Sequence, residues 1–264
     1  MEKPSPPNAS CFSTPGGTDE CAHDQRDPDA TDRSDEAPVG KILETTLQGQ
    51  KIGFHPQRIL LLPDLDAMLV ADIHLGKAEF MQGKGIPLSN QPHQKDHERL
   101  VKLVKEFQIK QLFILGDLVH RPRQNPQSLQ RLIRDLHPLA MEVHWIQGNH
   151  DGEHQRSLPD SWKVHSNALE LGPFVLRHQS SEEKYADFQI CGHVHPCVKI
   201  GDGRDKLRLS CFALKSKLLL LPSFGELTGG YELLPQEWET FVLCLGNEVS
   251  LLESSDLERF KKRS

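Results

Sequence analysis

The chain has 264 residues, of which 37% are hydrophobic, and its formal net charge is −6. This length is sufficient for one domain with a sizeable core, and no run approaches the roughly 18 apolar residues that a membrane helix needs. The first 40 residues also lack the apolar run of a secretion signal, so we expect a soluble, cytoplasmic protein with no membrane partner.

The net charge is concentrated at the start of the chain. Residues 1–36 contain nine acidic and three basic side chains, so the remainder is neutral overall. This stretch is rich in Pro, Ser, Gly and Asp and cannot offset the entropy cost of ordering. We predict a disordered acidic tail over residues 1–38 and a single domain over residues 39–264. A neutral domain gives no electrostatic support for a nucleic-acid surface, and it leaves a local patch open.

The six cysteines do not indicate a disulfide framework, because two lie in the tail and most of the others lie in apolar strand-like runs. Free cysteine often behaves as a small buried hydrophobe. We therefore expect Cys211 and Cys244 to be core residues.

The first half of the predicted domain alternates strands and helices. Apolar runs at 59–62 and 68–71 are bounded by Pro63, Asp64 and Asp66, as buried strands are. Ser89 is a candidate cap for a helix that ends near Phe107, and a second helix is expected over 126–136. Strands are expected at 111–115 and 142–146. This order favours an α/β layered core.

After about residue 160 the pattern changes to short strands, and this half is predicted to be rich in sheet. No internal repeat is evident. The expected strands are 163–164, 174–177, 188–191, 197–200, 207–212, 217–221 and 241–245.

Five short polar segments each follow an expected strand, which is where open α/β sheets place their sites. They are Asp72-Ile73-His74, Gly116-Asp117-Leu118-Val119-His120, Gly148-Asn149-His150-Asp151, the isolated His178, and Gly192-His193-Val194-His195. Imidazole nitrogen together with carboxylate or amide oxygen suits metals such as Mn, Fe and Zn. The glycines permit tight turns and close backbone approach. Each segment alone is a weak signal, since short motifs match falsely and a lone histidine is usually a hydrogen-bonded surface residue.

Taken in order, the five segments resemble the pattern of the calcineurin-like metallophosphoesterase superfamily, namely D-x-H, G-D-x-x-[DH], G-N-H-[DE], a lone H and G-H-x-H. The resemblance implies a four-layer α/β/β/α sandwich with mixed sheets flanked by helices. It also implies two divalent ions, with Mn²⁺ expected and Fe, Zn and Ni as alternatives that these ligand types leave open. By this resemblance one ion is held by Asp72, His74, Asp117 and His195, and the other by Asp117, Asn149, His178 and His193.

The resemblance further implies the chemistry. His150 is the expected general acid beside the phosphate, and Asp151 is expected to orient it. Two ions, usually about 3.5–4 Å apart in such sites, would supply a water of lowered pKa for attack on phosphorus. Lys77, three positions after His74, is a candidate for contacting a substrate phosphate, although exposed lysines are common. His120 either supports the site or closes a turn.

A narrower resemblance covers most of residues 42–234. The segments Ala71–Lys77, Gly85-Ile86-Pro87, Ser210-Cys211-Phe212, Leu221–Gly225 and Thr228-Gly229-Gly230 are similar to the ligase-associated DNA-damage-response phosphoesterases, or PdeM-type endonucleases. This implies a phosphodiester substrate, with DNA favoured, a role in DNA repair, and functional association with a DNA ligase and a helicase. The alternatives are a small-molecule or cyclic-nucleotide phosphodiesterase or phosphomonoesterase, which shares the same ligands, and a non-enzymatic interaction scaffold.

Overall fold

The structure is a computed structural model that describes residues 40–87, 89, 91–120, 127–151, 158–181, 187–201 and 206–257. The described residues belong to one compact unit, Pro38–Ser264. The predicted acidic tail lies outside the described residues. Within the described part of the chain, no helix is long and apolar enough to cross a membrane.

The first half of the unit forms a seven-stranded sheet whose strands lie in chain order. Strands β1 to β4 are antiparallel neighbours, and β4 to β7 run parallel. The elements are β1 (Leu43–Leu47), β2 (Gln50–His55), β3 (Ile59–Leu62), η1 (Pro63–Leu65), β4 (Ala67–Ala71), α1 (Lys77–Gly83), α2 (Gln91–Phe107), β5 (Gln111–Leu115), α3 (Gln127–Leu136), η2 (His137–Leu139), β6 (Glu142–Ile146) and β7 (Trp162–His165).

The second half forms a nine-stranded sheet, in which the central strands β9, β10 and β13 are parallel. The other neighbours are antiparallel, except that β11 and β14 are parallel. The elements are β8 (Ala168–Leu171), β9 (Phe174–Arg177), β10 (Phe188–Cys191), β11 (Pro196–Ile200), β12 (Leu207–Lys215), β13 (Leu218–Leu220), β14 (Tyr231–Glu232), η5 (Pro235–Glu237), β15 (Thr240–Cys244) and β16 (Val249–Glu253).

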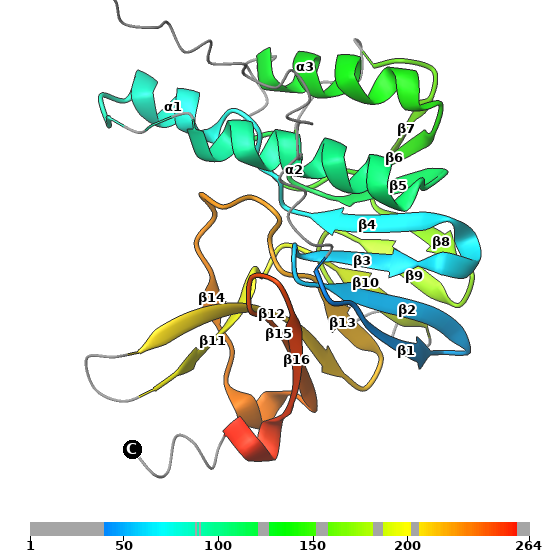
Figure 1. Cartoon of the computed structure of the whole chain (residues 1–264), viewed down its shortest axis with the longest axis vertical. Coiled ribbons are helices and arrows are strands. Elements are labelled where there is room, and N and C mark those ends of the chain that lie inside the picture. The colour runs from blue at the N-terminus through cyan, green and yellow to red at the C-terminus, as the bar shows by residue number, and fades with distance from the viewer. Residues whose placement is uncertain are drawn as a thin grey trace, which may run out of the picture. The chain divides into compact units, whose positions relative to one another are not determined.

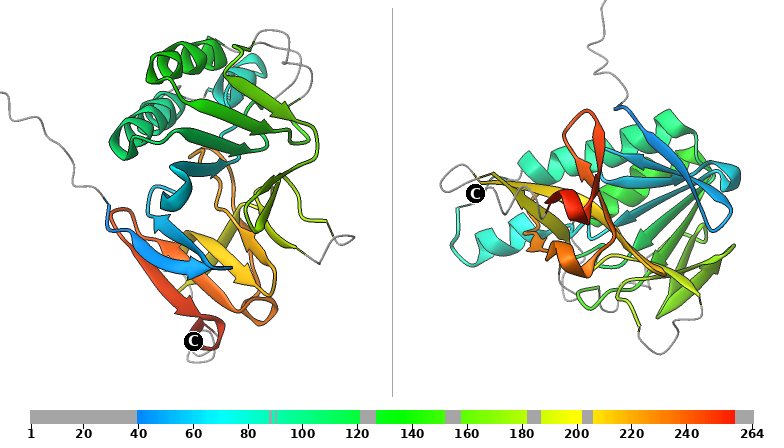
Figure 2. Two further views of the ribbon diagram at one scale, coloured as in Figure 1. Left: turned by 90° about the vertical axis from the view of Figure 1, so that its right-hand side faces the viewer. Right: turned by 90° about the horizontal axis from the view of Figure 1, so that it is seen from below.

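Both faces of the first sheet are buried at β3 and β4, which explains why these two strands are unbroken apolar runs. Successive side chains of a strand point to opposite faces. Met68 and Val70 of β4 therefore pack under α2 and α3, whereas Leu69 and Ala71 pack against the second sheet. Figures 1 and 2 show the two helices on one side of the first sheet and the second sheet on the other.

The outer face of the second sheet has a thin cover. Cys211 and Phe241 on that face pack with Leu233, with Trp238 just after η5, and with Leu257 in a short helical segment at 254–257. The layers are therefore helices, sheet, sheet and a minor fourth layer. The predicted α/β class with two mixed sheets is confirmed.

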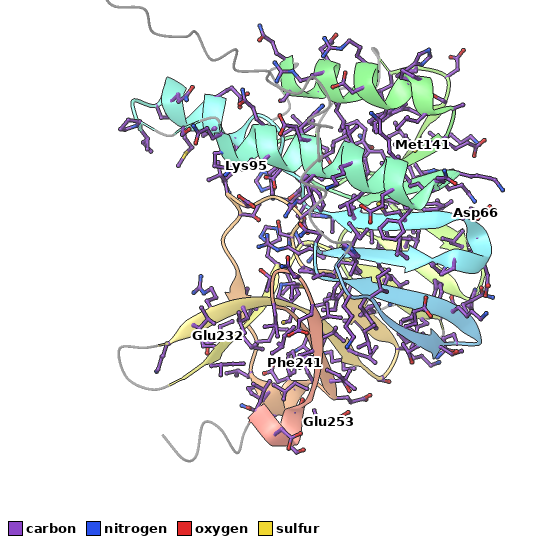
Figure 3. The ribbon with its side chains drawn as sticks, viewed as in Figure 1. Asp66, Lys95, Met141, Glu232, Phe241 and Glu253 are labelled. Atoms are coloured by element: carbon purple, nitrogen blue, oxygen red, sulfur yellow. The ribbon has the colours of Figure 1, made fainter. Side chains whose placement is uncertain are left out.

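The site lies where parallel strands end. Figure 3 labels Asp66 and Met141, which precede β4 and β6 and lie at one edge of the first sheet. The carboxyl ends of the same strands lie at the opposite edge. The polar segments predicted from the sequence begin there.

Candidate metal centre

The predicted ligands follow strands of both sheets. Asp72 comes directly after β4, Asp117 follows β5, and Asn149 follows β6. His178 and His193 follow β9 and β10 of the second sheet. Within each sheet these strands are parallel neighbours, so the residues that follow them lie together at the carboxyl ends of the strands.

Five of these residues have a left-handed backbone. The φ angles are 53° at Asp72, 53° at His74, 47° at Asp117, 67° at His193 and 52° at His195. This conformation is uncommon for residues with a Cβ, although Asp and His adopt it more readily than most. Residues held in it concentrate at functional sites, where the surroundings over-determine them.

One set of ligand atoms comes from Asp72, His74 and His195, hereafter the Asp72 group, and these atoms lie within 4.8 Å of one another. Within this group, His195 Nε2 and Asp72 Oδ1 are 3.4 Å apart. His195 donates from Nδ1 to the Gly229 carbonyl at 3.1 Å. That bond fixes the tautomer, and it leaves the Nε2 lone pair directed at Asp72.

A second set comes from Asp117, His178 and His193, hereafter the Asp117 group, with the same 4.8 Å limit. His178 donates from Nδ1 to the Leu115 carbonyl at 3.2 Å. Its Nε2 lies 3.0 Å from Asn149 Oδ1 and 3.0 Å from His193 Nδ1. Ligands about 2.0–2.1 Å from one ion and at right angles to each other are about 3 Å apart, so this spacing suits a shared ion.

Asp117 belongs to the second group and also faces the first. One carboxylate oxygen, Oδ2, is 3.7 Å from His74 Nε2, and the other, Oδ1, is 3.6 Å from His178 Nε2. The side chain is almost fully buried. Each oxygen thus faces a different group, as a bridging carboxylate would.

The three glycines of the polar segments leave room for the ligands. A Cβ at Gly116 would overlap the His178 ring, and one at Gly148 would overlap the Asp117 carboxylate. A Cβ at Gly192 would lie 2.7 Å from Asp72 Oδ2 and 2.8 Å from the Leu115 carbonyl oxygen. Close backbone approach was predicted for these positions, and here the backbone approaches the chain's own ligand side chains.

His150 occupies the open side of the site. Its side chain is 44% exposed, with Nε2 4.0 Å from Asp117 Oδ2. The His120 ring stacks on it, with centroids 5.7 Å apart and planes at 18°, and His120 also contacts Phe80 of α1. His120 therefore belongs to the surroundings of the site.

Asp151 acts on the turn rather than on the His150 ring in the described contacts. Its carboxylate accepts hydrogen bonds from the Val119 amide at 2.9 Å, the Gly148 amide at 2.7 Å and Trp145 Nε1 at 3.1 Å. Burial raises the pKa of this carboxyl to about 6. Any orientation of His150 by Asp151 thus passes through the backbone of the turn.

Burial and neighbouring charge shift the pKa values of the ligand histidines. Burial, followed by the charge of His195, lowers the pKa of His74 to about 2. Burial also lowers the pKa of His193. For His195, burial lowers the pKa, but the nearby Asp72 carboxylate, together with the Gly229 carbonyl and Asp117, raises it more, so that the pKa is raised overall. His74 and His193 are neutral at pH 7, which is the form that binds a metal.

The donor set fits a pair of divalent cations. Among the described residues, Asp72 Oδ1, both ring nitrogens of His74 and Nε2 of His195 are buried and make no hydrogen bond. A buried polar atom without a partner costs about 1–3 kcal/mol, and a metal ion would satisfy the Asp72 oxygen, His195 Nε2 and one of the two ring nitrogens of His74. Nitrogen and oxygen donors without thiolate suit Mn, Fe, Zn or Ni.

Some functional contacts had no signal in the sequence. The carbonyls of Leu115 and Gly229, which fix the tautomers of His178 and His195, are backbone groups that any residue carries.

Lys77 begins α1, and burial lowers the pKa of its ammonium. A contact between Lys77 and a substrate phosphate stays a prediction.

Comparisons with known proteins agree with this geometry. The sequence profile of the calcineurin-like phosphoesterases matches residues 66–179. A nuclease from Pseudomonas putida, MPE, has a similar crystal structure, with a TM-score of 0.66 and 30% identity over 80% of this chain and 100% of that chain. A protein of unknown function from Aquifex aeolicus has a TM-score of 0.35 and 18% identity over 53% of this chain and 81% of that one, too little to support an argument. No curated protein sequence matches.

The family profile spans the first three polar segments and His178, and the nuclease is matched over its full length. The remaining segment, 192–195, supplies His193 and His195 to the two groups. The chain therefore belongs to the calcineurin-like phosphoesterase family and is a metal-dependent phosphoester hydrolase.

Proposed function

We propose that this enzyme is a Mn²⁺-dependent phosphodiesterase that acts on DNA as an endonuclease in DNA repair. The observation that carries the metal-dependent phosphoesterase assignment is the pair of ligand groups joined by Asp117. The DNA assignment is supported by the similarity to the nuclease MPE. A cytoplasmic location, expected from the sequence, and association with a DNA ligase and a helicase, implied by the resemblance to the ligase-associated phosphoesterases, complete the proposal.

The metals would be held by the Asp72 and Asp117 groups together with Asn149. When bound, such a pair supplies an activated water and stabilises charge on the phosphoryl oxygens. Within the chain, the carbonyls of Leu115 and Gly229 keep the lone pairs of His178 and His195 directed inward. His150, exposed on the open side, donates a proton to the leaving oxygen.

The central experiment combines substrate and metal measurements. The full chain is stripped of metal, reloaded with Mn²⁺ and assayed on single-stranded DNA, duplex DNA, a generic diester, a monoester and a cyclic nucleotide. We expect cleavage within DNA. We also expect Asp117→Asn to lose at least one bound ion and at least about 100-fold in turnover, since even residues that only support ligands are worth 10–100-fold.

Asp135→Asn is a matched control, because Asp135 is a carboxylate that pairs with His97 on the helices at 2.8 Å. It should keep both ions and its activity. Hydrolysis of the cyclic nucleotide or the monoester without any cut in DNA would support the small-molecule alternative instead. An Asp117→Asn variant with two ions and full turnover would contradict the site.

A further inference from the structure

The connection between β13 and β14, residues 221–230, has no helix or strand and yet contacts the metal centre. Its first half follows the end of β4. The Phe224 amide donates to the Ala71 carbonyl at 2.8 Å, and the Ser223 hydroxyl donates to the Asp72 carbonyl at 2.8 Å. A Cβ at Gly225 would lie 2.5 Å from the Ile73 carbonyl oxygen. The backbone of Asp72 is therefore held by this connection.

The second half of the same connection holds His195. The Gly229 carbonyl accepts from His195 Nδ1 at 3.1 Å, and the Tyr231 amide, at the start of β14, donates to the His195 carbonyl at 2.9 Å. The ring of His195 is thus fixed by this connection, and its backbone by the first residue of the strand that follows it. Two of the three members of the Asp72 group depend on the connection, whereas His178 of the Asp117 group is held by Leu115 of β5.

Helix α2 holds the connection in turn. Asp96 is 1% exposed, and its Oδ2 accepts the Glu226 amide at 2.9 Å while its Oδ1 accepts Arg99 at 2.7 Å. Arg99 also donates to the Phe224 carbonyl at 2.5 Å, and its guanidinium lies 4.1 Å from the centre of the Phe224 ring. In Figure 1 the connection, drawn in orange, rises from β14 towards α2, and Figure 3 labels Lys95, next to Asp96, at that place.

A buried ion pair is a costly way to join a helix to a loop. Burial raises the pKa of Asp96 to about 6, despite the opposing effect of Arg99. Replacing such a pair by packed apolar residues is often neutral or stabilising. The pair instead fixes the position of the connection, because it holds the backbone at Phe224 and Glu226 through hydrogen bonds with defined geometry.

We propose that Asp96 and Arg99 are positioning residues for the metal centre, acting through residues 221–230 on the Asp72 group and not on the Asp117 group. The inference rests on the two-ion site of the proposed function. We call the Asp96–Arg99 pair and its bonds to Phe224 and Glu226 the clasp. The inference predicts that loosening the clasp selectively weakens the binding of the ion held by the Asp72 group. The expected loss is about 10–100-fold in the affinity of that ion, the range found for groups that support metal ligands.

The test is calorimetric titration of the metal-free full chain with Mn²⁺. Asp96→Asn replaces an acceptor oxygen by a donor, so either Arg99 or the Glu226 amide loses its partner. Arg99→Lys keeps the charge but cannot stack and reach both acceptors, and it provides a second variant if the first does not fold. His195→Ala serves as the reference for weakening of the Asp72 group alone.

We expect both clasp variants to show one ion at wild-type affinity and one weakened at least 10-fold, as in His195→Ala. High Mn²⁺ should then restore turnover to within a few-fold of wild type, which would not occur if the fold were simply damaged. Asp135→Asn removes the His97–Asp135 pair, which joins α2 to α3, and should change neither affinity.

Unchanged affinities in both clasp variants, or equal weakening of both ions, would overturn the inference while leaving the proposed function intact. A wild-type chain that binds fewer than two ions would instead contradict the proposed function, and the inference would fall with it.

Discussion

Asn149 and His150 are adjacent in one turn and have different surroundings. The Asn149 amide oxygen is 3.0 Å from His178 Nε2, inside the cluster of ligand atoms. The His150 ring points to the open side and stacks on His120. Its amide is nevertheless tied to the centre, since it donates to Asp117 Oδ1 at 3.0 Å. The backbone of His150 thus serves the site independently of its side chain, so removing the imidazole should leave the turn in place.

This difference yields a prediction. Asn149→Ala should lower metal occupancy, whereas His150→Ala should keep both ions and lose rate. The loss should depend on the leaving group, because p-nitrophenolate hardly needs protonation and the alkoxide left by DNA does. We expect His150→Ala to reduce DNA hydrolysis about 10²–10⁴-fold and p-nitrophenyl ester hydrolysis far less. Equal losses on both substrates with metals retained would assign His150 to positioning, and metal loss would make it a ligand.

For single residues, the sequence indicates which side chains are candidate ligands but not which residues and backbone groups hold those ligands in place. Asp, His and Asn recur behind strand-like runs, and the resemblance of their order to the calcineurin-like pattern implied the ligand set; the structure brings all seven together. The left-handed φ angles at five of them depend on tertiary contacts. Asp96 and Arg99 look like ordinary polar residues of an amphipathic helix, so nothing in the pattern marks them as supports of the site.

Among the elements, the strands and helices with strong periodicity match their predictions closely. Strands β5, β6, β9 and β10 have the predicted limits, and α2 begins at Gln91, whose amide donates to the Ser89 hydroxyl. Helix α1 was not predicted, since its seven residues are too few to show a period. Strands β1, β2, β8, β14 and β16 were also missed, because they are short or carry exposed polar residues that only pairing with neighbours makes strand-like.

One contact between β2 and α2 makes stability depend on pH. His55 is 1% exposed, its Nδ1 accepts the Gln57 amide at 3.1 Å, and its ring packs edge-on to Phe107. Burial lowers its pKa from 6.5 to about 4. The unfolded chain therefore binds the proton more tightly. The contribution of neutral His55 to the free energy of unfolding is therefore complete above pH 6.5 and is lost as the pH falls towards 4.

We expect His55→Asn to reduce acid sensitivity. Asparagine keeps an acceptor for the Gln57 amide and does not titrate. Between pH 7.5 and 5 the wild type should lose about 2 kcal/mol more of unfolding free energy than the variant. Urea unfolding of the metal-free proteins at both pH values measures this, and the ligand histidines titrate in both, so their effect cancels. Equal losses would show that His55 is not buried as a neutral ring.

For the whole molecule, the sequence predicts two halves but not how they meet. The alternation of strands and helices before residue 160 and the short strands after it indicate the two sheets. Because strands such as β4 are apolar on both faces, the pattern cannot say which face meets the other sheet and which meets helices. That choice is what brings the Asp72 and Asp117 groups together, since each takes ligands from both sheets.

Metal binding should therefore stabilise the contact between the two sheets. Ligands that exist as a set only in the folded chain bind the native state selectively, and each ion adds about 2.7 kcal/mol at 100 times its Kd. For a domain of this size that corresponds to a rise in Tm of about 5–10 °C per ion. Scanning calorimetry of the metal-free chain titrated with Mn²⁺ should show two increments. His195→Ala should lose most of one of them, because it removes a second-sheet ligand from the Asp72 group. Stoichiometric binding of two ions without any rise in Tm would mean that the unfolded chain binds them as well, and the ions would then not join the sheets.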